Sequence, residues 1–200
     1  MRVLTLLATA AVAMAACGGA AQPAATTAPT TAPTAARTTA PTPPPTVAAT
    51  AAPTPATSFK FTADLKPENE VPPIANEEKT GNGKATVTFD VTRDAAGKIS
   101  GAKAAVDVSF AGLPAAAAIT IGHIHGPAAA GVNAGVKVPF KTDADSPIPL
   151  TGGVGAFKKA DVTVDADTMQ GIIDNPGNWY VNFHTKLNPG GLMRGQLIKG

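Results

Sequence analysis

Two neighbouring segments of this chain, residues 85–92 and 103–110, alternate apolar and polar side chains with a period of two. The apolar positions are Ala85, Val87, Phe89 and Val91 in the first segment and Ala104, Val106, Val108 and Phe110 in the second. This period is typical of β-strands that bury one face. The sequence Asp94-Ala95-Ala96-Gly97 between them predicts a turn, so the two strands pair antiparallel. The buried face of such a sheet requires a second layer to cover it.

Further short segments carry strand patterns. Phe59 and Phe61 share one side of a first strand, and later strands are expected over residues 119–125, 136–140, 154–164, 178–184 and 192–199. Pro139 favours an edge position for its strand because proline cannot donate a ladder hydrogen bond. One short helix is predicted over residues 165–173, stopped by Asn175-Pro176-Gly177. Seven or eight strands without βαβ alternation predict an all-β fold, an antiparallel Greek-key-like β-sandwich or barrel.

The first 16 residues have the pattern of a signal peptide, with a positive start, an apolar run and small residues at the end. The run is too short to span a bilayer, which takes about 20 residues. Ala15-Ala16-Cys17 resembles the bacterial lipobox, which implies that Cys17 carries acyl chains such as palmitate and anchors the protein to the cell envelope. The alternative is an ordinary secretory signal with an unrelated cysteine. Both interpretations predict an extracytoplasmic protein.

Cys17 begins a segment that cannot contribute to a core. Of residues 18–57, 35 of 40 are Ala, Thr or Pro. Such a segment buries too little apolar area to offset the entropy of ordering it. Residues 17–57 are therefore predicted to be a disordered tether, and residues 58–200 the folded domain.

The predicted domain is electrically neutral, because its 14 basic residues balance 14 acidic ones. It lacks the basic surface and, with one Trp and one Tyr, the aromatic platforms of nucleic-acid-binding proteins. We expect a monomer that contacts the membrane through its anchor, and whose other partners are an extracellular protein or a small anion. Trp179 is expected in the core, and Glu68 and Glu70, in a proline-flanked loop, are expected in solvent.

The chain has three histidines, and all lie at the ends of predicted strands. His123 and His125 project from the same side of one strand, and His184 ends another, where it shares a face with Asn182. Imidazole suits copper and zinc, so convergence of the three rings would make a metal site. Asn182 would then orient a ring or bridge strands. The alternative is that the histidines only hydrogen-bond neighbouring loops, since the sequence alone does not bring the two strands together.

Four ordered motifs resemble the CHRD domain, a family named for the animal secreted protein chordin. They are Glu70-Val71-Pro72-Pro73, Gly122-His123-Ile124-His125-Gly126-Pro127, Tyr180-Val181-Asn182-Phe183-His184-Thr185, and Asn188-Pro189-Gly190-Gly191 through Arg194-Gly195-Gln196-Leu197. The resemblance runs from about Phe59 to Ile198 and implies a β-sandwich. The family typically has Glu-Ile before Arg-Gly-Gln, where this chain has Leu192-Met193.

A weaker resemblance is to the copper site of copper-zinc superoxide dismutase. His123, His125 and His184 match three copper ligands of that family in order, and Arg194 matches its anion-guiding arginine. The fourth copper histidine, the zinc loop and the disulfide have no counterpart here. The sequence thus leaves three hypotheses: a CHRD-like binding domain that holds copper or zinc, a copper-dependent oxidoreductase that uses Arg194, and a purely structural envelope domain. Arg194 also has a simpler interpretation as a surface charge paired with a loop carboxylate.

Overall fold

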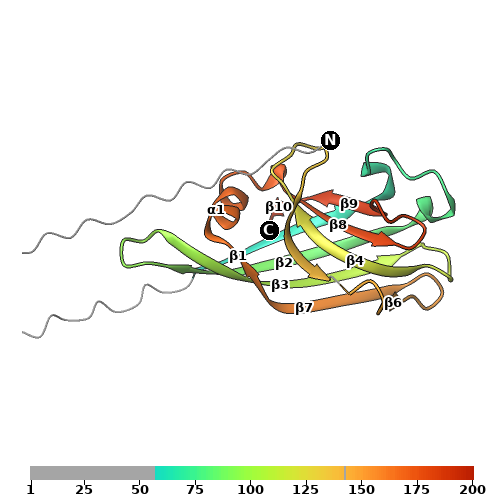
Figure 1. Cartoon of the computed structure of the whole chain (residues 1–200), viewed down its shortest axis with the longest axis horizontal. Helices are drawn as coiled ribbons and strands as arrows, with labels where there is room; N and C mark the ends of the chain where they lie inside the picture. The colour runs from blue at the N-terminus through green and yellow to red at the C-terminus, as the bar shows by residue number, and fades with distance from the viewer. Residues whose placement is uncertain (1–56, 142) are drawn as a thin grey trace, which may run out of the picture. The chain divides into compact units, whose positions relative to one another are not determined.

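The computed structural model describes residues 57–141 and 143–200, which form ten strands, one α-helix and three short 3-10 helices. The predicted signal peptide, Cys17 and all of the predicted tether except Thr57 lie outside the described residues. The described strands make two antiparallel sheets that do not close into a barrel. The prediction of an all-β sandwich with one short helix is therefore confirmed (Figure 1).

Sheet A holds the hairpin that the alternation predicted. Its order is β10-β1-β2-β3-β7, with β1 at Thr57–Leu65, β2 at Asn82–Arg93, β3 at Ile99–Ala111, β7 at Gly155–Val164 and β10 at Ile198–Lys199. Strands β2 and β3 pair over nearly their whole length, with Val87 opposite Val106. Their predicted inward residues are all buried.

Sheet B carries all three histidines. Its order is β5-β4-β8-β9, with β4 at Ala118–His125, β5 at Val136–Lys141, β8 at Tyr180–Thr185 and β9 at Met193–Gln196, while β6 at Ile148–Pro149 pairs with β4. Strand β5, which contains Pro139, lies at the edge of this order as expected. The chain crosses between the sheets after β3, β6, β7 and β9, which gives the predicted Greek-key-like order.

The core lies between the two sheets, where each contributes one face. Ile124, Val181 and Phe183 of sheet B have no exposed surface, and the ring of Phe183 meets that of Phe110 from sheet A edge-on at 4.9 Å. Figure 1 shows β4, β8 and β9 crossing over the longer strands of sheet A. Because side chains alternate along a strand, the histidines lie on the other face of sheet B, away from this core.

The last predicted strand, residues 192–199, is corrected by the structure. It is two strands, β9 in sheet B and β10 in sheet A, separated by Leu197. Leu197 is 1% exposed, and its backbone N–H donates to the carbonyl of Trp179 rather than to either sheet. Gly195 allows β9 to approach β1 here, because a side chain at this position would overlap the backbone of Asp64. The chain therefore leaves sheet B after β9 and joins sheet A at β10, and the apolar residue between them, Leu197, gives no sign of this break in the sequence.

The helix α1 at Ala166–Asp174 confirms the predicted helical turn. The Asp165 carboxylate caps it by accepting a hydrogen bond of 2.8 Å from the Thr168 backbone N–H. Trp179 is 5% exposed and packs against Gly171 of the helix, so its predicted core position is confirmed. The 3-10 helix Pro176–Asn178 follows α1, which delays the start of β8 from the predicted residue 178 to Tyr180.

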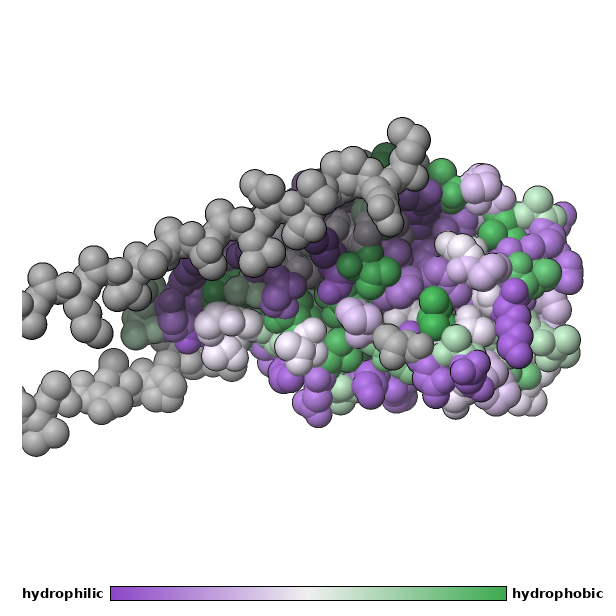
Figure 2. Space-filling view, viewed as in Figure 1, coloured by the Kyte–Doolittle hydropathy of each residue, from purple (hydrophilic) through white to green (hydrophobic). Residues whose placement is uncertain are grey.

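The surface of the domain carries both polar and apolar residues. Figure 2 shows polar residues over most of the face drawn, with apolar residues in small separate groups. In residues 57–141 and 143–200, no helix has both the length and the apolar character needed to cross a bilayer.

Candidate metal centre

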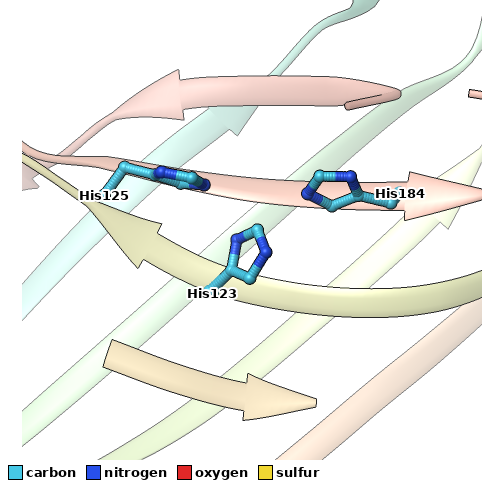
Figure 3. Close-up of side chains that lie close together, drawn as sticks. All are labelled: His123, His125 and His184. Carbon is cyan, nitrogen blue, oxygen red and sulfur yellow. The ribbon is translucent and has the colours of Figure 1, made fainter. Parts of the chain in front are cut away.

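The three histidines form one cluster on the outer face of sheet B. His123 and His125 come from β4 and His184 from β8, its neighbour in the sheet. The ring centre of His123 lies 4.5 Å from that of His125 and 4.7 Å from that of His184 (Figure 3). One nitrogen from each ring lies within 4.8 Å of the others. The convergence that the sequence left open is therefore present.

The protons on two of the rings are fixed by backbone carbonyls. Nδ1 of His125 lies 2.7 Å from the carbonyl oxygen of Ala134, and Nδ1 of His184 lies 2.9 Å from that of Pro189. A carbonyl only accepts hydrogen bonds, so both Nδ1 atoms donate. In the neutral ring the lone pair is then on Nε2. Histidines that bind metals usually have their other nitrogen held by such a carbonyl or by a carboxylate.

Burial keeps the three rings neutral. It lowers the pKa of His123 to about 3, with further lowering from the neighbouring His125 and His184. Burial also lowers the pKa of His125 and of His184, although the carbonyls of Ala134 and Pro189 oppose the change. A neutral imidazole has a lone pair available for a metal, whereas a protonated one has none.

Two loops set the positions of these carbonyls. Ala134 lies in the loop between β4 and β5, and Pro189 in the loop between β8 and β9. The second loop is held by the buried carboxylate of Glu78, which accepts hydrogen bonds of 2.5 Å from the Thr185 hydroxyl and from the Asn188 amide. Asn188 directly precedes Pro189, so this contact fixes the carbonyl that holds His184.

A second group, called the polar cluster here, lies next to the histidines and consists of Glu70, Asn182 and Arg194. Asn182 is opposite His123 on one side and opposite Arg194 on the other in the sheet register. Its amide donates to Glu70 Oε1 at 2.6 Å, so it binds this carboxylate and bridges β8 to the loop after β1. Arg194 Nε lies 3.5 Å from Glu70 Oε2.

Two expectations about these charges are corrected. Glu70 was expected in solvent but is 6% exposed. Arg194, in its simpler interpretation a surface charge paired with a loop carboxylate, does pair with one, that of Glu70, but is 2% exposed. Glu68 is largely exposed, as expected. The prolines around Glu70 suggested a solvated loop, but the loop folds over sheet B and buries the carboxylate. Burial raises the pKa of Glu70 to about 7, although Arg194 and Asn182 offset part of the rise.

Tyr180 connects the two clusters, a role that was not predicted from the sequence. Its ring stacks on that of His125, with centres 4.8 Å apart and planes within 7°. The guanidinium carbon of Arg194 lies 4.8 Å from the centre of the same ring. Tyr180 shares the strand face of Asn182 and His184, and this parity was the one signal that could have identified it.

Four buried side-chain atoms on this face have no hydrogen-bond partner among the described residues. They are His123 Nδ1, His184 Nε2, Asn182 Oδ1 and Arg194 Nη2. Such atoms are uncommon in folded proteins and call for a bound water, ion or functional role. Two of the four belong to the histidine cluster, and one of them is the Nε2 that the Pro189 contact leaves with a lone pair.

A family model for the CHRD domain matches residues 61–197, more than half of the chain. The chain belongs to the CHRD family. No curated protein and no solved structure matches it. The CHRD region contains the histidine cluster, the polar cluster and Tyr180. CHRD domains are typically extracellular or secreted, and membership supports a binding or interaction domain.

Proposed function

We propose that this CHRD domain binds one copper or zinc ion through His123, His125 and His184. The observation that carries the proposal is the convergence of three imidazole nitrogens within 4.8 Å of one another. Ligand distances of about 2.0–2.1 Å require the three nitrogens to approach one another more closely. Since two of the rings are already oriented by carbonyls, small movements of the side chains suffice.

We propose further that the protein is exported and held at the bacterial cell envelope by acyl chains on Cys17. The supporting observations are the signal-like residues 1–16, the lipobox-like Ala15-Ala16-Cys17 and the extracellular character of CHRD domains. Mass spectrometry of the mature amino terminus tests this. The expected result is an acylated Cys17, and an unmodified terminus at another residue would contradict it.

The metal site is tested by measuring bound metal in the full chain with Cys17→Ser, which removes the only competing thiol. We expect one equivalent of copper or zinc per chain. His123→Ala and His184→Ala should each weaken binding by at least about 100-fold, because losing even a partner of a ligand costs 10–100-fold.

The matched control is Gln196→Ala, which removes a half-buried amide that donates to the carbonyls of Ala128 and Gly177 and not to the histidines. This variant should keep the parent affinity. Failure of the parent to bind stoichiometric copper or zinc, in a chain shown to be folded, would leave the histidines with a structural role only.

A copper-dependent oxidoreductase is the second candidate, carried by the ordered match of the three histidines. A guanidinium that steers anions to a site must be open to solvent and not neutralised by a carboxylate. Arg194 is 2% exposed and is paired with Glu70. The geometry therefore favours binding over catalysis. Superoxide removal by the copper-loaded chain that is lost in a folded Arg194→Met variant, and kept in Arg194→Lys, would support the enzyme instead.

A further inference from the structure

We infer that the histidine cluster selects monovalent copper, Cu(I), over the divalent ions Zn(II) and Cu(II). This inference rests on the proposed metal site and goes beyond it by naming the charge of the ion. It follows from the charges around the cluster, from its burial and from the arrangement of the rings.

The ligand set supplies no negative charge. Among the described residues, the group of potential ligand atoms that converges here contains three histidines and no carboxylate or thiolate. The buried carboxylate of Glu70 accepts a hydrogen bond from Asn182, which is opposite His123 in the sheet register, and pairs with Arg194. The charge of a bound ion is thus left uncompensated by its ligands.

A fixed positive charge lies close to the cluster. Arg194 lies against Tyr180, and Tyr180 stacks on His125. An arginine side chain stays protonated in proteins, so this charge is permanent. The ionised Glu70 carboxylate offsets part of this charge. The repulsion of a bound ion that remains grows in proportion to the charge of that ion, so it acts twice as strongly on a divalent ion as on a monovalent one.

Burial adds to this discrimination. His123 is 7% exposed and His184 is 6% exposed, so an ion between them loses most of its hydration. The cost of taking an ion out of water grows with the square of its charge, about fourfold from a monovalent to a divalent ion. Coordination by neutral imidazoles offsets a larger share of this dehydration cost for the monovalent ion than for the divalent ion.

The ring arrangement separates the two oxidation states of copper. Cu(II) prefers a square or tetragonal set of ligands in one plane. The three rings come from two adjacent strands, and the plane of His123 is turned by 89° from that of His125 and by 79° from that of His184. Three donors on one sheet face suit a three-coordinate ion without such a demand.

The test uses the full chain with Cys17→Ser, loaded with Cu(I) under anaerobic conditions and titrated with a chromophoric Cu(I) chelator. Zn(II) and Cu(II) affinities are measured on the same protein with competing indicators. We expect Cu(I) to remain bound in a hundredfold excess of Zn(II). The reduction potential of the copper-loaded protein should exceed that of aqueous copper by about 59 mV for each tenfold preference for Cu(I) over Cu(II).

The matched variant is Glu70→Gln, which keeps the shape of the side chain and removes the carboxylate charge. At pH 8 we expect it to widen the ratio of Cu(I) to Zn(II) affinity by about tenfold, the effect of one unit charge across the width of a neighbouring strand. Arg194→Met should narrow the ratio, and Arg194→Lys, which retains the charge, should preserve it.

Zn(II) or Cu(II) binding as tightly as Cu(I), with the histidine variants still abolishing it, would overturn this inference and leave the metal site intact. Absence of binding for all three ions would overturn the proposed function itself. A ratio that does not respond to Glu70→Gln and Arg194→Met would show that the neighbouring charges play no part in selection.

Discussion

Replacing Arg194 by Met is expected to lower the free energy of unfolding by about 3 kcal/mol, the lower end of the range for removing one member of a buried ion pair. The guanidinium joins three parts of the chain. Its Nε donates to the carbonyl of Asn69 at 2.7 Å, its Nη1 to that of Val132 at 3.2 Å, and it pairs with Glu70. The lower end is expected because Glu70 can take up a proton when the cation is lost. Urea denaturation at pH 7 with a chelator present measures the change.

The control for this variant is Lys158→Met, which breaks an ion pair of the same kind on the surface. Lys158 pairs with Asp107, and both side chains are more than half exposed. Exposed ion pairs contribute less than about 1 kcal/mol to stability, so the free energy of unfolding of this variant should be close to that of the parent. Arg194→Lys should recover only part of the loss, because an ammonium group cannot reproduce the fork of donors. Equal costs for Arg194→Met and Lys158→Met would contradict the buried role of Arg194.

The stability of the domain is expected to depend on the protonation of Glu70. Its pKa is about 7 in the folded protein and 4.5 in the reference state, so the folded state binds this proton more readily. The contribution is fully present below pH 4.5 and is lost as the pH rises through about 7. The loss amounts to roughly 3 kcal/mol, from 1.36 kcal/mol for each pKa unit.

Glu70→Gln isolates this effect because glutamine mimics the protonated acid at every pH. The difference in unfolding free energy between parent and variant should change by roughly 3 kcal/mol between pH 4.5 and 8, with the parent losing stability. The histidines have lowered pKa values, so they act in the opposite direction, but they are common to both chains and cancel. A difference that stays constant with pH would show that the Glu70 carboxyl is not perturbed.

Asp165→Asn provides a control of opposite sign. Hydrogen bonds from the Thr168 backbone and side chain lower the pKa of Asp165. Its stabilising contribution is therefore present above pH 3.8 and is lost as the pH falls through the lowered folded pKa. The free energy of unfolding of the parent should increase relative to that of Asp165→Asn as the pH rises through the acid range. Relative to that of Glu70→Gln, it should decrease at higher pH.

The features that the sequence predicted correctly depend on local patterns. The alternation of apolar and polar residues in β2 and β3 predicts directly which residues face the core. The two-residue spacing of His123 and His125 predicts that they share a face of their strand. His184 required more, because its approach to His123 depends on the pairing of β4 with β8, between which β5, β6, β7 and α1 intervene. The ordered match of the three histidines to the copper ligands of superoxide dismutase suggested that they converge, whereas the period of a strand carried no information about which strands pair.

The burial of Glu70 could not be predicted from its own neighbourhood. Two adjacent prolines and polar residues are typical of an exposed loop. The side chain that binds it, Asn182, is 112 positions away in the sequence. The division of residues 192–199 between two sheets was missed for a related reason, since Leu197 is apolar like its neighbours and only the tertiary structure distinguishes a strand that ends from one that continues.

The pairing of β4 with β8 also sets when the histidine cluster can exist. A nascent chain has made His123 and His125 about sixty residues before His184 is added, and Arg194 follows later still. Until then a metal ion would meet two rings on a strand that lacks its neighbour, and two imidazoles hold an ion far less well than three. Capture of an ion at the proposed site therefore requires that β8 has been synthesised and has paired with β4.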